Sequence, residues 1–334
     1  MRKLLWLAIS GALAVPAQAY DKIPQQDGFS GYLFLGGSAN SMETNTVASI
    51  GDNDVGAERI DSINDSPDSE DYSGIVPAFG LSYTFAGSRT QIFGGTEQED
   101  FLTQDSSIGI GIRQGLGGLG NLRASLLAST GSEVWEDPYL ENADRRATDR
   151  DSGGMRLGWE HIFESDFAVT LTSRSIELDD EFSGASQPLT PAQRALLERE
   201  GDQNKVDFSY RWEPSPDHVL IPTLSYVDHD LDGEAMAMDG YQFELNYAYL
   251  GMRNWEFIVN LLAGSLESDE TNPLYGETQD LDRLGASAAA TYKEPFGLQD
   301  WKASATLSYG EEDSNIDFYD SSLQSLVIGM MYTF

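Results

Sequence analysis

Basic side chains recur along this sequence at positions that alternate with apolar residues. Arg156 stands between Met155 and Leu157, and Lys205 precedes a run in which apolar residues occupy every second position. On a β-strand such a residue points to the face opposite its apolar neighbours. The positions with this placement are Arg113, Arg123, Arg156, Arg174, Lys205, Arg211, Arg283, Lys293 and Lys302. Rings of Arg and Lys attract anions, so these residues are candidates for the wall of an anion-attracting pore.

Acidic residues are distributed differently. The chain has 55 Asp and Glu against 20 Lys and Arg, a formal net charge of −35. Few of the carboxylates share the face of the basic residues, and those are Glu160, Asp207, Glu244 and Glu256. Two interpretations stay open: a basic wall that selects anions, or a lumen in which these carboxylates and others from inward-folded loops neutralise the basic side chains. The acidic balance argues against nucleic-acid binding, which needs a basic face.

Residues suited to catalysis or metal binding are scarce. The chain has no Cys and three His, and the acid-rich segments lack the spacing of an EF-hand loop. We therefore expect no enzyme activity, no cofactor and no metal site.

Strands must position the basic residues. Leu326, Ile328, Met330, Tyr332 and Phe334 fall on one face of the last segment of the chain. Comparable period-two alternation recurs in about 14 segments, or 12 if the weak segment at 90–96 and one partner are not strands. About six short turns alternate with seven polar loops. This pattern predicts an all-β, antiparallel, up-and-down transmembrane β-barrel, in which closure leaves no strand edge exposed.

Two further features fit a barrel in a membrane. Aromatic residues gather beside the short turns and predict a girdle at one membrane interface: Tyr83, Phe85, Phe163, Phe167, Tyr210, Trp212, Tyr249, Trp255, Tyr292, Trp301 and Tyr332. In the loop at 178–203, the capping box that starts at Thr190 has Pro191 at the first helical position and predicts a short helix to Arg199. This helix either enters the mouth of the barrel or lies outside it.

The N-terminal residues have the pattern of a secretory signal peptide. Arg2 and Lys3 precede a short apolar stretch, and Ala17-Gln18-Ala19 forms a small-residue cleavage site. We expect a signal peptide at residues 1–19 and a single barrel domain at residues 20–334.

Together, the signal, the alternation, the girdle and the final Phe334 resemble the outer-membrane β-barrels of Gram-negative bacteria. The resemblance is closest to an uncharacterised group from marine gammaproteobacteria that is known as a domain of unknown function. It implies that Tyr332 and Phe334 form the signal read by the barrel assembly machinery. It also implies location in the cell outer membrane, contact with lipid and lipopolysaccharide, short turns on the periplasmic side and long loops outside. The tripeptide Asp228-His229-Asp230 is similar to the Asp/His sites of barrel proteases only over its own length.

The expected function is a porin-like channel for the diffusion of small hydrophilic solutes, including anionic ones such as acidic oligosaccharides. The alternative is a non-conducting barrel whose acidic loops bind divalent cations, lipopolysaccharide or an external partner. We expect a monomer, since no apolar face is interrupted in a way that marks a subunit interface.

Overall fold

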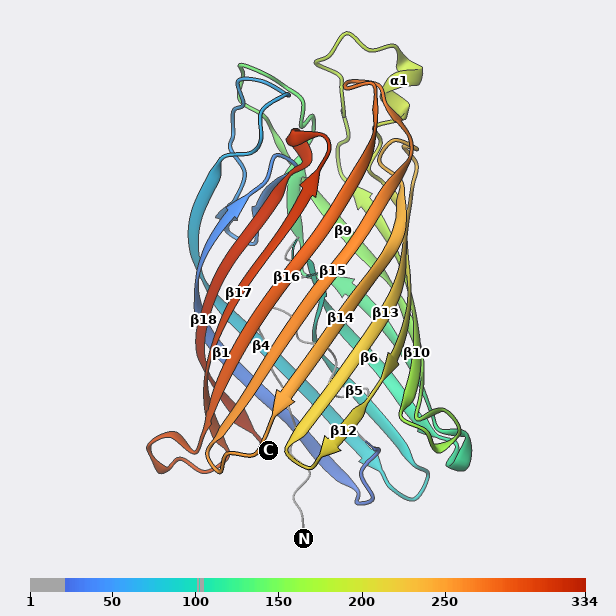
Figure 1. The fold of residues 1–334 in the computed structure, drawn as a ribbon, viewed down its shortest axis with the longest axis vertical. Coiled ribbons are helices and arrows are strands. Elements are labelled where there is room, and N and C mark those ends of the chain that lie inside the picture. The colour runs from blue at the N-terminus through green and yellow to red at the C-terminus, as the bar shows by residue number, and fades with distance from the viewer. Residues whose placement is uncertain (1–21, 101, 103–104) are drawn as a thin grey trace.

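The computed structural model describes residues 22–100, 102 and 105–334, and the expected signal peptide lies outside this part of the chain. The wall is a closed antiparallel barrel of 14 strands (Figure 1). In chain order they are β1 (Gly28–Glu43), β4 (Ser69–Phe85), β5 (Thr90–Asp100), β6 (Asp105–Gly115), β7 (Asn121–Ser129), β9 (Ala147–Glu160), β10 (Phe167–Leu178), β11 (Gly201–Tyr210), β13 (His218–Leu231), β14 (Met238–Tyr249), β15 (Trp255–Asn272), β16 (Glu277–Lys293), β17 (Trp301–Ser314) and β18 (Ser321–Thr333). The weak segment at 90–96 belongs to β5, so the larger predicted number is confirmed.

The barrel closes between its first and last strands. β1 pairs with β4 on one side and with β18 on the other, in a register that places Tyr32 opposite Thr333. Beyond the ladder, the Gly31 amide donates to the Phe334 carbonyl at 3.0 Å, and the Phe334 amide donates to the Gly31 carbonyl at 3.1 Å. The apolar C-terminal strand therefore has partners on both edges.

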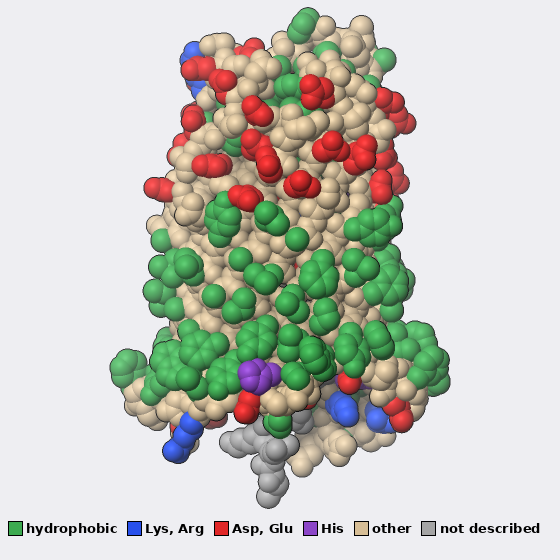
Figure 2. All heavy atoms as spheres, in the orientation of Figure 1, with side chains coloured by type: hydrophobic (Ala, Val, Ile, Leu, Met, Phe, Trp, Pro, Cys, Tyr) green, Lys and Arg blue, Asp and Glu red, His purple; other side chains and the backbone are tan. Residues whose placement is uncertain are grey.

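A belt of exposed apolar side chains surrounds the half of the barrel that carries the short turns (Figure 2). Leu126, Leu307 and Ile328 are examples, and the predicted aromatic girdle lies along the lower edge of the belt, with Trp255 packed on Tyr292 at 4.9 Å between ring centroids. Acidic side chains gather directly above the belt. An apolar band of this kind on a closed barrel is the lipid-facing surface of an outer-membrane β-barrel.

The polar loops are shorter than the sequence pattern predicts, because the strands continue beyond the belt. β15 and β16 are joined by residues 273–276 alone, and the acidic segment at 267–270, expected in a loop, lies in β15. Above the lipid both faces of a strand can be polar, so the apolar alternation that marks a strand is lost there although the backbone ladder continues. We call this end of the barrel the loop end and the opposite end the turn end.

Beside β4, the strand that forms the wall near the turn end is β5, and nearer the loop end other strands take its place. β4 and β5 pair only from Phe85 opposite Thr90 to Gly80 opposite Gly95. The Thr96 hydroxyl then takes the place of the ladder, because it lies 3.2 Å from the Phe79 amide and 3.3 Å from the Phe79 carbonyl oxygen.

Beyond this point β5 leaves the wall. At Gly95 an added Cβ would lie 2.5 Å from the Phe79 carbonyl oxygen, so the close crossing needs a glycine. The next residue of β4 on the edge that β5 vacates is Pro77, which has no amide hydrogen to leave unpaired.

Three short strands complete the wall nearer the loop end. They are β2 (Val47–Ile50), β3 (Asn53–Asp54) and β8 (Ser132–Trp135). β2 pairs with β3 and with β8, and β8 pairs with β9. β3 lies beside β4, where the Asn53 amide nitrogen is 3.5 Å from the position of a Cβ on Gly74.

The loops pack over the loop end of the barrel. Ile60, Tyr139, Leu197, Phe318 and Tyr319 form a buried cluster that joins four separate connections. We call this cluster the lid. The helix α1 (Pro191–Ala195) stands at its outer edge (Figure 1) and has the predicted capping box, although it ends before Arg199.

Polar contacts hold the lid together. The Tyr139 and Tyr319 hydroxyls lie 2.7 Å apart, and the Asn272 amide donates to Tyr319 at 2.8 Å. Burial raises the pKa of Tyr319 to about 12, so both phenols stay protonated at neutral pH. The Arg145 guanidinium donates to the carbonyls of Asn45, Pro138 and Ala57 and lies 4.4 Å above the Trp135 ring.

Across the part of the chain that the structure describes, no helix is long and apolar enough to span a membrane.

Candidate functional site

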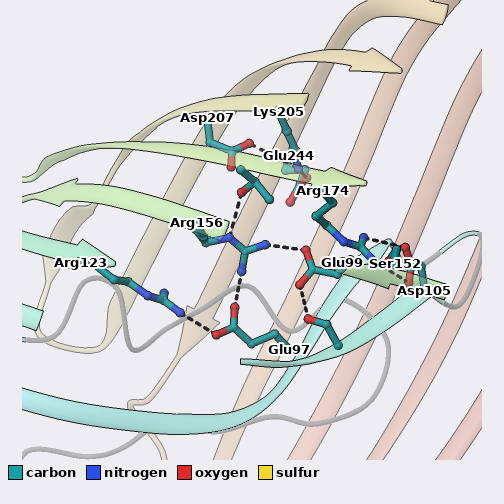
Figure 3. Close-up of polar contacts among 12 residues, drawn as sticks. Glu97, Glu99, Asp105, Arg123, Ser152, Arg156, Arg174, Lys205, Asp207 and Glu244 are labelled. Atoms are coloured by element: carbon teal, nitrogen blue, oxygen red, sulfur yellow. Dashed lines mark hydrogen bonds and ion pairs between the residues drawn. The ribbon is translucent and has the colours of Figure 1, made fainter. Parts of the chain in front are cut away.

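Carboxylates of β5 and β6, from Glu97 to Asp100 and at Asp105, lie inside the lumen and meet the predicted basic wall (Figure 3). Glu97 binds Arg123 at 2.7 Å and also pairs with Arg156. Arg156 binds Glu99 at 2.5 Å, and Ser107 donates to the same carboxylate. The two arginines come from β7 and β9, so the turned-in carboxylates cross-link the hairpin to the wall.

Further pairs extend this layer around the lumen. Arg174 on β10 binds Asp105 at 2.7 Å, and Lys205 on β11 lies 3.3 Å from Glu244 and 3.4 Å from Asp207. From the other side of the barrel, Arg283 on β16 binds Asp100 at 2.6 Å and Glu312 at 2.8 Å. We call this set of pairs the ion-pair layer.

A second group of pairs lies nearer the turn end. Arg113 binds Glu160 at 2.6 Å, and both side chains are buried. Lys293 and Lys302 each lie 3.0 Å from Glu256. Arg211 follows β11 instead of facing the lumen from within a strand, and it binds Glu213 of the adjoining short strand β12 (Trp212–Ser215) at 2.6 Å.

The structure thus gives every one of the predicted basic residues a carboxylate partner. Some partners are the predicted inward carboxylates, and others come from the hairpin: Glu97, Glu99, Asp100 and Asp105. The sequence pattern does not predict that these hairpin carboxylates lie in the lumen. The arrangement is the charge-neutralised alternative, in which the guanidinium groups are occupied by the protein itself.

Apolar side chains line the lumen between the ion-pair layer and the lid. Along β16, Leu281 lies one inward position closer to the loop end than Arg283, and along β10, Ile176 and Leu178 follow Arg174. Val227, Met238, Leu266 and Leu281 form one buried cluster, and Val134, Ile176 and Leu178 form another.

These clusters border a cavity of about 460 Å³, whose lining also includes residues of the ion-pair layer and Tyr319 of the lid. The cavity therefore combines apolar clusters with many polar and charged side chains, a lining suited to binding a small amphipathic molecule.

Comparison with known proteins places the chain in a family. A family model described as a protein of unknown function, DUF2860, matches residues 28–333. The chain belongs to the DUF2860 family. The predicted resemblance to a domain of unknown function is therefore confirmed, while the marine origin stays a prediction.

The DUF2860 barrel is also similar to solved structures. A Pseudomonas aeruginosa FadL homologue has 10% sequence identity over 96% of this chain and 94% of its own, with a TM-score of 0.49. The Ralstonia pickettii toluene transporter TbuX has 11% identity over 97% of this chain and 96% of its own, also with a TM-score of 0.49. A search of curated protein sequences finds no match.

One cation of the DUF2860 cavity differs from the others. Arg150 lies on the inward face of β9, with Leu178 and Ser132 as its cross-strand neighbours, and it lines the cavity. Within the described chain, its guanidinium has no hydrogen-bond or ion-pair partner. The sequence does not single out Arg150 as an inward residue, because it stands between Asp149 and Asp151 in a polar stretch that is typical of a loop. Its placement could have been predicted, because Arg150 and Arg156 are an even number of residues apart and so share one face of a strand.

His229 also reaches the cavity. It lies on the inward face of β13, opposite Met238 of β14, and is not part of an exposed acidic loop. Its neighbours Asp228 and Asp230 alternate with it along the strand and so point to the other face.

The predicted assembly signal has a different environment. Tyr332 and Phe334 lie on the outer surface at the turn end, with ring centroids 5.9 Å apart, and Phe334 is 46% exposed. Both rings are open to lipid. Their role as a signal stays a prediction.

Proposed function

We propose that this DUF2860 barrel is an outer-membrane transport channel for small apolar or amphipathic molecules. The observation that carries the proposal is the cavity beneath the lid, whose wall includes two buried apolar clusters. Its walls bury Val227, Leu266 and Leu281 on the inward face of a barrel, the face that borders water in a porin.

This proposal replaces the expectation of a pore for hydrophilic anions. An anion-selective wall needs cations that are open to the solute, whereas Arg156, Arg174 and Arg283 bind carboxylates of the chain itself. The lid also packs over the loop end, so a solute meets apolar side chains instead of a wide water-filled path. Apolar walls of this kind favour a ligand that leaves water on binding.

Binding of an uncharged fluorescent probe tests the proposal. The mature protein, reconstituted in nanodiscs of neutral lipid, is titrated with N-phenyl-1-naphthylamine, and empty nanodiscs supply the background. We expect saturable binding by the protein above this background. Leu281→Trp should weaken it at least about tenfold, because the larger ring fills the space that the probe needs.

Leu307→Trp is the matched control, because Leu307 lies on the lipid-facing side of the neighbouring strand β17 and is 63% exposed. It should bind the probe as the wild type does. Absence of saturable binding, or equal binding by the Leu281→Trp variant, would refute a cavity-based channel. Retention of the folded band on unheated gels separates loss of the cavity from loss of the barrel.

A further inference from the structure

Arg150 is the one cation of the cavity that the described chain leaves without a partner. The other Arg and Lys residues of the lining bind carboxylates at 2.5–3.4 Å: Arg123, Arg156, Arg174, Arg199, Lys205 and Arg283. A guanidinium has five N–H donors and no acceptor. The donors of Arg150 that do not bind the protein can therefore bind a ligand.

Apolar clusters lie on one side of Arg150, while Asp100, Asp105, Arg174 and Arg199 also line the cavity and act on the charge of Arg150 without pairing with it. Its cross-strand neighbour Leu178 packs with Ile176 and Val134, and Leu231 packs against the same cluster. The cluster of Val227, Met238, Leu266 and Leu281 lines the cavity as well. Arg150 is thus a cation in a cavity partly lined by apolar side chains, where an attraction between opposite charges is less screened than in water.

We propose that Arg150 binds the headgroup of an amphipathic carboxylate whose apolar body lies against these two clusters. The inference rests on the proposed function and deepens it by naming the chemical class of the ligand. A carboxylate fits because its two oxygens accept two parallel N–H donors of one guanidinium. A fully apolar ligand would leave Arg150 unpaired and desolvated, which is unfavourable.

The charge of the outer surface indicates how Arg150 contributes to ligand binding. The chain carries a net charge of −35, and its acidic side chains gather above the lipid-facing belt (Figure 2). This surface repels anions at long range, an effect that salt screens within about 10 Å. Arg150 therefore contributes to affinity by direct contact, and not by steering anions from solution.

A pair of ligands with the same chain and different headgroups tests the proposal. Decanoate and decanol are titrated, at pH 8 and in 0.15 M salt, into the mature protein in nanodiscs of neutral lipid, with empty nanodiscs subtracted. We expect Arg150→Gln to weaken decanoate binding about tenfold to a hundredfold, the range for a charge-assisted hydrogen bond, and to leave decanol binding unchanged. Arg150→Lys keeps the charge without the paired geometry and should recover part of the decanoate affinity.

Arg146→Gln is the control, because Arg146 belongs to the same segment but its side chain is 78% exposed. It should bind both ligands as the wild type does. If decanoate and decanol bind the wild type but Arg150→Gln weakens neither or weakens both equally, the headgroup site is refuted while the apolar channel stands. If the wild type binds neither ligand, the proposed function fails and the headgroup site with it.

Discussion

In the middle of the lumen, Arg156 binds both Glu97 and Glu99, whereas nearer the loop end Arg150 faces the cavity without a described partner. Both residues lie on the inward face of β9. The two residues differ in their neighbours. Arg156 meets the carboxylates of the β5–β6 hairpin, whereas Arg150 lies beside Leu178, which packs with Ile176. The number of basic residues in a barrel wall therefore says little about selectivity, because only those without internal partners can meet a solute.

Breaking the ion-pair layer should have the largest effect. Glu97→Gln removes the carboxylate that joins Arg123 and Arg156, and leaves a largely buried guanidinium without its counter-charge. We expect the free energy of unfolding to fall by about 3 kcal/mol. Urea unfolding in lipid vesicles, followed by tryptophan fluorescence, measures it.

The matched control for this variant is Glu136→Gln. Its partner Arg146 is exposed, and the two charged atoms lie 3.6 Å apart. Because Arg146 is 78% exposed and the contact is long, this pair should contribute less than about 1 kcal/mol. Equal losses for Glu97→Gln and Glu136→Gln would contradict the role given to the ion-pair layer.

Loosening the lid should have a smaller and more local effect. Arg145→Lys keeps a positive charge but cannot reach the carbonyls of Asn45, Pro138 and Ala57 together. We expect local opening of residues 44–68 and 130–146 to become easier by about 2 kcal/mol, with the barrel intact. Hydrogen exchange measured by mass spectrometry reports both regions.

Arg59→Lys is the control for the lid, since Arg59 is exposed in the same loop. Its exchange pattern should match that of the wild type. Faster exchange throughout the strands of the Arg145→Lys variant would mean that Arg145 supports the whole barrel instead of the lid.

The smallest effect is expected at the edge of the lid. Thr190→Ala removes the side chain that caps α1 by accepting from the Gln193 amide, and should destabilise this short helix by about 1 kcal/mol. Exchange should rise at 191–195 only, with ligand binding unchanged. Ser186→Ala, in the same loop and exposed, is the comparison. A change in the affinity of the cavity for a ligand would show that α1 also contributes to ligand binding.

Strand number and direction were predictable because the lipid-facing half of each strand obeys a strict two-residue period. Leu326, Ile328 and Phe334 carry that signal, and even the weak β5 fits it at Ile92. The same period predicted most of the inward basic residues, but it missed Arg150 and placed Arg211 in a strand that ends at Tyr210. Their partners could not be predicted, because the contact between Asp100 and Arg283 joins residues 183 positions apart, and no local pattern encodes it. The apolar cavity was missed for a related reason, since Leu281 and Val227 look like ordinary strand residues until the barrel is closed.

The replacement of β5 by the β2–β3 hairpin near the loop end has a consequence for the order of folding. β2 is encoded soon after β1, but its partner β8 comes only after four wall strands have intervened: β4, β5, β6 and β7. Until residues 132–135 are in place, β3 can already lie beside β4, but the other edge of the hairpin, along β2, has no strand to pair with. Contacts between distant parts of a chain form slowly, because loop closure costs entropy before any contact forms. Sealing of this seam is therefore a late event, and the seam is the place where an incompletely assembled barrel would first let water or lipid into its wall.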